Sequence, residues 1–264
     1  KVFAKSRSCV VVDDYDGSMT MRLCLSEHMQ SSIFWYGYYS RDIILLLNKL
    51  LKPGMTVFDV GANVGEITLA SSRRVGVTGS VYAFEPLPML YEELNINIDS
   101  NCLTQVTALK IGISQFSGRT QIYKTSADFR DGTTHAGLGT LYASDVRGTP
   151  VGEIQLRSLD EVVKEMNIER VDLIKIDIEG AELPALKGAS YTIKRFKPYL
   201  IIEIQYETAD QAGYKAGDIL DLLDRYGYKF FSIGRKAKLV PLTVNTLKPF
   251  QNVFCVHSCN SLMF

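Results

Sequence analysis

The stretch from Gly54 to Ala70, GMTVFDVGANVGEITLA, constrains the fold more than any other part of the chain. Its apolar run at 56–60 predicts a buried strand, and the amphipathic run at 64–74 predicts a helix. Two glycines at the spacing GANVG lie between them. In α/β proteins, a tight glycine turn between a strand and a helix holds an anionic or polar ligand on backbone N–H groups. The stretch therefore predicts a ligand-binding turn in an α/β fold.

The rest of the chain alternates strands and helices after an N-terminal hairpin. Two β-rich runs around DYDGS predict a hairpin at 8–25, and a helix follows at 40–51 with Ser40 as its N-cap. Strands are predicted at 56–60, 80–84, 105–111, 119–124, 153–157, 171–176, 199–204, 228–233 and 252–257, and helices at 64–74, 87–99, 158–166, 181–195 and 215–226. This alternation implies parallel strands with right-handed crossovers. The nearly continuous apolar runs VDLIKI and YLIIEI are typical of strands covered on both faces.

Charge and hydropathy argue against two classes of partner. The 29 basic and 29 acidic residues cancel, which argues against a broad nucleic-acid surface. No stretch approaches the roughly 20 uninterrupted apolar residues that a membrane-spanning helix needs. We therefore expect neither a nucleic-acid partner nor a membrane span. The 264 residues predict a hairpin extension at 1–39 and one large domain at 40–264.

The five cysteines, at positions 9, 24, 102, 255 and 259, form no CxxC pair. Their spacing favours unpaired thiols over a zinc site. Unpaired thiols predict a reducing, cytoplasmic setting. The chain also lacks an initiator Met, from which we expect it to be part of a longer polypeptide, fused to further domains.

The residues around the glycine turn narrow the choice of ligand. The GxxxG pair is not the GxGxxG dinucleotide fingerprint, and no Lys-Ser/Thr pair follows to form a P-loop. Asp59, at the end of the strand, would repel a pyrophosphate and attract an ammonium or a sulfonium. Glu85, in VYAFEP, ends the next strand and can accept both hydrogen bonds of a ribose diol. S-adenosylmethionine carries both a sulfonium and a ribose diol, and it has no phosphate. Each acid alone has a structural alternative, a loop cap for Asp59 and a surface acid for Glu85.

Three longer motifs add a family resemblance. GMTVFDVGANVGEIT, VYAFEPLPMLYEELNINI and VDLIKIDIEGAELPALKGA resemble the signature of the FkbM family of S-adenosylmethionine-dependent methyltransferases. IQLRSLDEVV is similar to the segment before that family's fourth strand, and the resemblance covers roughly residues 40–257. It implies an α/β class I methyltransferase (Rossmann-like) fold, with a seven-stranded, mostly parallel sheet, helices on both faces and an N-terminal β-hairpin and helix extension. It also implies methylation of hydroxyl oxygens, often on sugars or polyketide-type products.

The resemblance assigns the cofactor to the ends of the first three strands of the domain. The residues so implied are Asp59, Gly61, Asn63 and Gly65 at the methionine end, Glu85 and Pro86 at the ribose, and Ile113 and Ser114 at the adenine. The two glycines permit close approach of the backbone, since a Cβ would intrude. For Ile113, plain core packing is an equal alternative.

Acids at the ends of later strands are the candidates for catalysis. Asp177 follows VDLIKI and Glu203 ends YLIIEI, so either can be the general base that takes a hydroxyl proton. His135, in the segment TTHAGLG, is a third candidate. Two acids at these positions also resemble the divalent-cation site of catechol-type O-methyltransferases. A hard cation usually has more oxygen ligands, so we expect no metal.

Acceptor recognition is predicted at three places. Glu179 lies beside the catalytic acids, with stabilisation of a helix N-terminus as its alternative role. Trp35 and Tyr36 are candidates for a stacking platform. The glycine-rich region 126–152 lacks periodicity and is a candidate lid.

The sequence thus predicts an O-methyltransferase acting on a hydroxyl of a sugar or glycan. One alternative is a polyketide-type or other secondary metabolite as acceptor. Another is a non-catalytic cofactor- or partner-binding domain of a larger glycan-assembly protein. The presence of both Asp59 and Glu85 argues against this last alternative.

Overall fold

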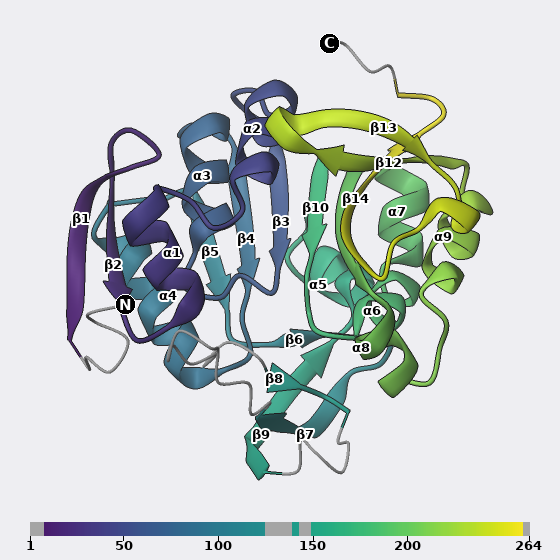
Figure 1. Cartoon of the computed structure of the whole chain (residues 1–264), viewed down its shortest axis with the longest axis horizontal. Coiled ribbons are helices and arrows are strands. Elements are labelled where there is room, and N and C mark those ends of the chain that lie inside the picture. Colours follow the sequence, from purple (N-terminus) through teal and green to yellow (C-terminus); the bar gives the residue numbers. More distant parts are fainter. Residues whose placement is uncertain (1–7, 125–138, 143–148, 261–264) are drawn as a thin grey trace.

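The computed structural model describes residues 8–124, 139–142 and 149–260. Its centre is an eight-stranded sheet in the order β13-β12-β14-β11-β10-β3-β4-β5 (Figure 1). Five strands are parallel: β3 (Thr56–Val60), β4 (Ser80–Phe84), β5 (Val106–Leu109), β10 (Leu173–Ile176) and β11 (Tyr199–Gln205). Three form the antiparallel end: β14 (Phe250–His257), β12 (Tyr228–Gly234) and β13 (Lys238–Leu242). The predicted class I methyltransferase sheet is confirmed, with β13 as an additional edge strand.

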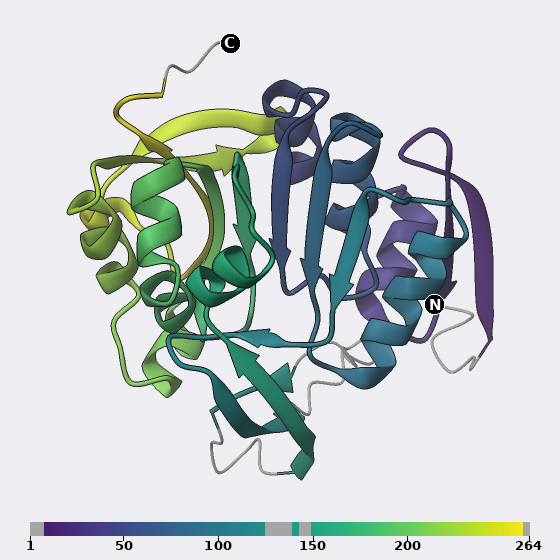
Figure 2. The same cartoon turned by 180° about the vertical axis from the view of Figure 1, so that it is seen from behind.

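Helices cover both faces of this sheet (Figures 1 and 2). On one face lie α2 (Arg41–Leu50) and α3 (Glu66–Val75); on the other lie α5 (Leu159–Glu165), α6 (Glu182–Lys187), α7 (Ser190–Phe196) and α9 (Gly217–Asp224). Successive residues of β3 point to opposite faces, so Val57 packs in the cluster of Leu46, and Phe58 packs in that of Leu186. Strands buried on both sides therefore need the continuous apolar runs that the sequence shows.

The region predicted as one helix at 181–195 is two helices, α6 and α7. Gly188 divides them, and a Cβ built there would lie 2.1 Å from the carbonyl oxygen of Ser114. The backbone therefore approaches a neighbouring turn too closely for any residue but glycine. The sequence also did not predict the short helices α1 (His28–Tyr36) and α8 (Tyr206–Gln211), whereas α4 (Pro88–Asp99) lies close to its predicted position.

A second sheet lies at the end of the molecule toward which β3 and β4 point (Figure 1). It contains β6 (Gly112–Ile113), β9 (Thr149–Arg157), β7 (Gly118–Lys124) and β8 (Gly139–Thr140), in that order. Its strand β9 begins four residues before the predicted start at 153. Most of the region 126–152, with His135, lies outside the described residues, so the lid and the role of His135 stay predictions.

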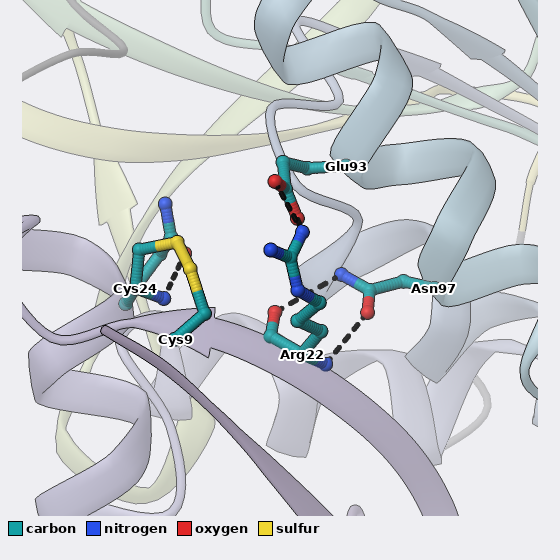
Figure 3. The surroundings of a disulfide bond; sticks show 6 residues. Cys9, Arg22, Cys24, Glu93 and Asn97 are labelled. Atoms are coloured by element: carbon teal, nitrogen blue, oxygen red, sulfur yellow. Dashed lines mark hydrogen bonds and ion pairs between the residues drawn. A yellow bond between two sulfur atoms is a disulfide. The ribbon is translucent and has the colours of Figure 1, made fainter. Parts of the chain in front are cut away.

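The N-terminal hairpin, β1 (Cys9–Tyr15) and β2 (Met19–Cys24), packs against α4. Arg22 forms a 2.5 Å ion pair with Glu93 on α4, and its backbone N–H donates to Asn97 Oδ1 at 2.7 Å (Figure 3). Leu23 and Leu90 belong to one hydrophobic cluster. The hairpin is therefore fixed to the large domain by charge, hydrogen bonds and apolar contact together.

The prediction of unpaired thiols is wrong for Cys9 and Cys24, which form a disulfide (Figure 3). They face each other in the antiparallel register of the hairpin, with Cα atoms 4.1 Å apart, although 15 positions separate them in the sequence. Cys102, Cys255 and Cys259 are free. The cysteines therefore no longer support the prediction of a reducing compartment. No helix within the described ranges is long and apolar enough to cross a bilayer.

We expect the disulfide to stabilise the fold. The double variant Cys9→Ala/Cys24→Ala should lower the free energy of unfolding by about 3 kcal/mol, since the bridge restricts the unfolded chain across a separation of 15 residues. Urea denaturation measures this, with Cys102→Ala as the matched control. A double variant as stable as the control would show that the bridge contributes nothing.

Candidate active site

A cleft of about 1270 Å³, including its open mouth, lies at the carboxyl ends of the central strands. Its walls come from three parts of the chain. The strand ends contribute Gly61, Asn63, Glu85, Pro86, Ile113, Lys175, Asp177, Glu179 and Glu203; the N-terminal segment contributes Glu27, Met29, Gln30, Tyr39 and Ser40; the small sheet contributes Ile122, Leu141, Ile154 and Leu156. The N-terminal segment therefore builds one wall of the pocket.

Glu85 carries a carboxylate suited to a diol. One oxygen accepts the backbone N–H of Asn63 at 2.9 Å, and the other accepts that of Leu87 at 2.9 Å. Burial raises the pKa of Glu85 to about 7, although both hydrogen bonds favour the charged form. A carboxylate has about four acceptor positions, so Glu85 keeps capacity for two further donors on the pocket side.

The glycine turn is shaped by the protein around it. A Cβ on Gly61, where φ is +82°, would lie 1.9 Å from the carbonyl oxygen of Asp177. A Cβ on Gly65 would lie 2.9 Å from Leu94, and Gly65 does not line the pocket. At both positions another part of the chain approaches the glycine closely, and the approach of a ligand stays a prediction. The contact at Gly61 fixes the turn against the residue that follows β10.

Lys175 links the glycine turn to the acid after β10. Its buried ammonium donates to the Gly61 carbonyl at 3.1 Å and lies 3.3 Å from Asp177 Oδ2 and 3.8 Å from Asp59 Oδ1. Burial lowers the pKa of Lys175, but the carboxylates of Asp177 and Asp59 outweigh burial and raise it overall. Lys175 therefore stays charged.

Asp59 is fully buried behind Lys175 and does not line the pocket. Its Oδ2 accepts the Thr68 hydroxyl at 2.6 Å, while its Oδ1 has no hydrogen-bond partner among the described residues. Burial raises the pKa of Asp59. In this structure Asp59 affects the pocket through Lys175.

Three acids form a cluster on the other side of Lys175. Carboxylate oxygens of Asp177, Glu179 and Glu203 lie within 4.8 Å of one another. Burial, followed by the charges of Asp177 and Glu179, raises the pKa of Glu203 to about 10. Glu203 therefore holds a proton at neutral pH, so that of these two acids Asp177 is the better candidate for the general base.

Two buried carboxylates, which the sequence analysis did not assign to the site, fix the loops at its rim. Glu66 accepts the backbone N–H groups of Tyr39 at 2.6 Å and Ser40 at 3.1 Å. Glu182 accepts the N–H of Gly180 at 3.0 Å and the hydroxyl of Tyr214 at 3.0 Å. The only sequence signal for either was an acid in the first turn of a helix.

Of the remaining predicted site residues, one lines the pocket and three do not. Ile113 lines the pocket and also belongs to the main core. Ser114 lies outside the lining, and its N–H donates to the Arg157 carbonyl at 2.9 Å. Trp35 and Tyr36 are 52% and 79% exposed and also lie outside the lining, whereas the nearby Tyr39 is part of it.

Comparison with known proteins identifies the family. Residues 59–230 match the model of the methyltransferase FkbM domain. The chain belongs to the FkbM family of S-adenosylmethionine-dependent methyltransferases. The pocket fits this cofactor, because Glu85 offers the acceptor set that a ribose diol requires. Glu85 and Pro86 would hold the nucleoside of S-adenosylmethionine, and Asn63 and Gly61, beside Lys175, would lie at its methionine end.

Three curated relatives show how far the similarity extends. The AMB antimetabolite synthetase AmbE of Pseudomonas aeruginosa is 28% identical over 233 residues, which cover 77% of this chain and 11% of AmbE. The hexuronic acid methyltransferase AglP of Haloferax volcanii is 28% identical over 69% of this chain and 67% of AglP. The 2-O-methyltransferase NoeI of Sinorhizobium fredii is 24% identical over 70% of this chain and 76% of NoeI. The chain thus spans only a small part of AmbE.

The raised pKa of Glu203 predicts how stability depends on pH. The unfolded chain releases this proton near 4.5 and the folded protein near 10, so between these values the folded state binds more protons. Stability should therefore fall as pH rises through this window, and Glu203→Gln should weaken the fall. Melting temperatures from pH 5 to 9 test this, and parallel curves for the two proteins would contradict it.

Glu85 should contribute to cofactor affinity. Glu85→Ala should weaken binding of S-adenosylhomocysteine by about 1–3 kcal/mol, the cost of orphaned hydrogen bonds. In the wild type, affinity should also fall as pH drops through about 7, because protonation of Glu85 removes acceptor capacity. Calorimetry measures both effects, with Glu92→Ala on the exposed side of α4 as control. Unchanged affinity in the Ala variant would remove Glu85 from the site.

Proposed function

We propose that this methyltransferase domain methylates a hydroxyl oxygen of a sugar or glycan, with Asp177 as the general base. The observation that carries the proposal is the position of Lys175. Its ammonium contacts the carbonyl of the glycine turn and the carboxylate of Asp177, so the cofactor end and the acid cluster belong to one pocket.

The cofactor supplies a methyl group on a sulfonium, which is already activated for transfer. The chain's own residues then have three tasks, which are to hold the acceptor oxygen in line, exclude water and remove the hydroxyl proton. Positioning contributes several kcal/mol to such reactions, and a general base contributes roughly 10²–10⁴-fold in rate.

Asp177 and Glu203 divide the acid–base roles at the acceptor. Asp177 is about one-third exposed in the pocket and beside Lys175, so it can reach a bound hydroxyl and accept its proton. Glu203 keeps its own proton and therefore donates a hydrogen bond that orients the acceptor. Glu179 accepts hydrogen bonds from further hydroxyls.

Two relatives support the acceptor class by what their names say of them. AglP is a hexuronic acid methyltransferase, so its acceptor is a sugar derivative, and NoeI is a 2-O-methyltransferase, so the atom that it methylates is an oxygen. A pocket rim rich in carboxylates also suits a polyol, because carboxylates accept hydrogen bonds from hydroxyl groups. As in AmbE, the domain can belong to a larger protein with further activities. The Cys9–Cys24 bridge supports an oxidising compartment over the cytoplasmic one predicted from the cysteine count.

Replacing Asp177 tests the proposal directly. Asp177→Asn keeps the shape of the side chain and removes its basicity, so turnover should fall by roughly 10²-fold or more while cofactor affinity stays nearly intact. Labelled methyl transfer and calorimetry separate the two effects, with Asp99→Asn on the exposed end of α4 as control. Normal turnover in Asp177→Asn would make the residue structural and return the role of base to Glu203 or His135.

We expect methyl transfer to need no metal. Lys175 and the proton on Glu203 offset the charge of the acid cluster without a metal ion. Activity should therefore survive exhaustive treatment with a chelator. Loss of activity on chelation, with recovery on adding magnesium, would show that Asp177, Glu179 and Glu203 bind a divalent ion.

A further inference from the structure

Tyr39 presents an aromatic ring to the pocket. Among the described residues, the lining contains two aromatic side chains, those of Phe84 and Tyr39. Phe84 is 1% exposed and packs in the main core, whereas Tyr39 is 47% exposed. In the described part of the pocket, the ring of Tyr39 is therefore the aromatic surface that a ligand can contact. Ligand sites are typically lined by such surface together with a few polar groups.

The path of the chain brings Tyr39, and not its aromatic neighbours, to the pocket. Gly37 ends α1 in the left-handed conformation, with a φ of +82°. Before this turn, Tyr36 is 79% exposed and lies outside the lining. After it, Tyr38 is directed to the hairpin, where its hydroxyl donates to Asp16 Oδ1 at 3.0 Å. Tyr39 follows as the residue that faces the pocket.

Glu66 fixes the backbone at Tyr39. Its buried carboxylate accepts the N–H groups of Tyr39 at 2.6 Å and Ser40 at 3.1 Å. Glu66 is the first residue of α3 and directly follows the glycine turn, so these hydrogen bonds set the position of Tyr39 relative to the cofactor turn. The ring of His28 also contacts that of Tyr39 edge-to-face, with centroids 6.2 Å apart. Tyr39 is thus held by buried contacts, as a binding residue has to be.

The hydroxyl of Tyr39 is close enough to the acid cluster to be affected by its charges. Partial burial, followed by the charges of Glu203 and Asp177, raises the pKa of Tyr39 to about 12. The hydroxyl therefore stays protonated at neutral pH and can donate a hydrogen bond. The ring accordingly lies beside the acids that the proposed function assigns to the acceptor hydroxyl.

We propose that Tyr39 is an acceptor-binding residue, whose ring contacts the C–H groups of a pyranose while Asp177 and Glu203 contact its hydroxyl groups. This inference rests on the proposed function, because it specifies how the same acceptor is held. A pyranose exposes C–H groups on its faces and hydroxyl groups around its rim, and this pocket offers an aromatic surface and carboxyl groups in one cavity. Tyr39 thereby takes the stacking role that the sequence predicted for Trp35 and Tyr36.

Two variants of Tyr39 separate the ring from the hydroxyl. Tyr39→Leu removes the ring and Tyr39→Phe removes only the hydroxyl, and both keep the contact with Glu66, which the backbone makes. Protein loaded with S-adenosylhomocysteine is titrated with the methyl glycosides of glucose, galactose, mannose, xylose and rhamnose, and binding is measured by saturation-transfer NMR. We expect at least one glycoside to bind the wild type. Tyr39→Leu should weaken its binding by about 10-fold, and Tyr39→Phe should retain most of the affinity.

Variants at two other exposed rings complete the comparison. Tyr191→Leu makes the same change on α7, outside the lining, and is the matched control. Wild-type affinity in Tyr39→Leu, or an equal loss in Tyr39→Phe, would overturn the role of the ring. Weakened binding in Tyr36→Leu in place of Tyr39→Leu would return that role to the platform predicted from the sequence and overturn the inference. A matching loss of S-adenosylhomocysteine affinity in Tyr39→Leu would show a general disturbance of the pocket and overturn it too.

Turnover of the same glycosides separates this inference from the proposed function. Weaker glycoside binding in Tyr39→Leu, without methylation of any glycoside by the wild type, would refute the proposed function and leave the sugar-binding role of Tyr39 in place. Methylation of a glycoside with the same KM in the wild type and Tyr39→Leu would support the proposed function and overturn the role of Tyr39. Absence of binding of every glycoside to the wild type would also overturn it.

Discussion

The pocket depends on the buried ammonium of Lys175. It joins the carbonyl of the glycine turn to the carboxylate of Asp177, and it balances the otherwise uncompensated charge of Asp59. Charges in such a setting are tolerated only as partners, because removing one leaves the others buried without compensation. The same ammonium fixes the ends of β3 and β10 relative to each other, which are the two strands that carry the cofactor turn and the catalytic acid. Lys175 therefore both holds the two strand ends together and positions the candidate base.

Much of this arrangement follows from local sequence patterns. The parallel strands are long apolar runs, and the glycine turn follows the first of them, so their order and the position of the site at their carboxyl ends could be predicted. Glu85 and Asp177 could also be predicted as site residues, because an acid directly after an apolar strand seldom has a structural role there. Both line the same pocket.

Other features depend on contacts between distant segments, which no local pattern reveals. Cys9 and Cys24 are paired by the hairpin register, and Glu66 reaches back to the backbone of Tyr39 and Ser40. Gly61 is a glycine because Asp177 lies against it, a reason found only in the folded chain. The same limit explains why Tyr39 was missed in favour of Trp35 and Tyr36: these aromatic residues are close in sequence, and only the path of the chain after α1 decides which one faces the pocket.

We propose that this pocket transfers a methyl group from S-adenosylmethionine to a hydroxyl oxygen. Incubation with methyl-¹³C-labelled cofactor and a panel of neutral sugars and glycan fragments, followed by carbon NMR of the products, tests it most directly. We expect a labelled O-methyl carbon on a sugar with the wild-type protein, and its loss with Asp177→Asn. Label on nitrogen, or no transfer to any member of the panel by protein that binds the cofactor, would contradict it.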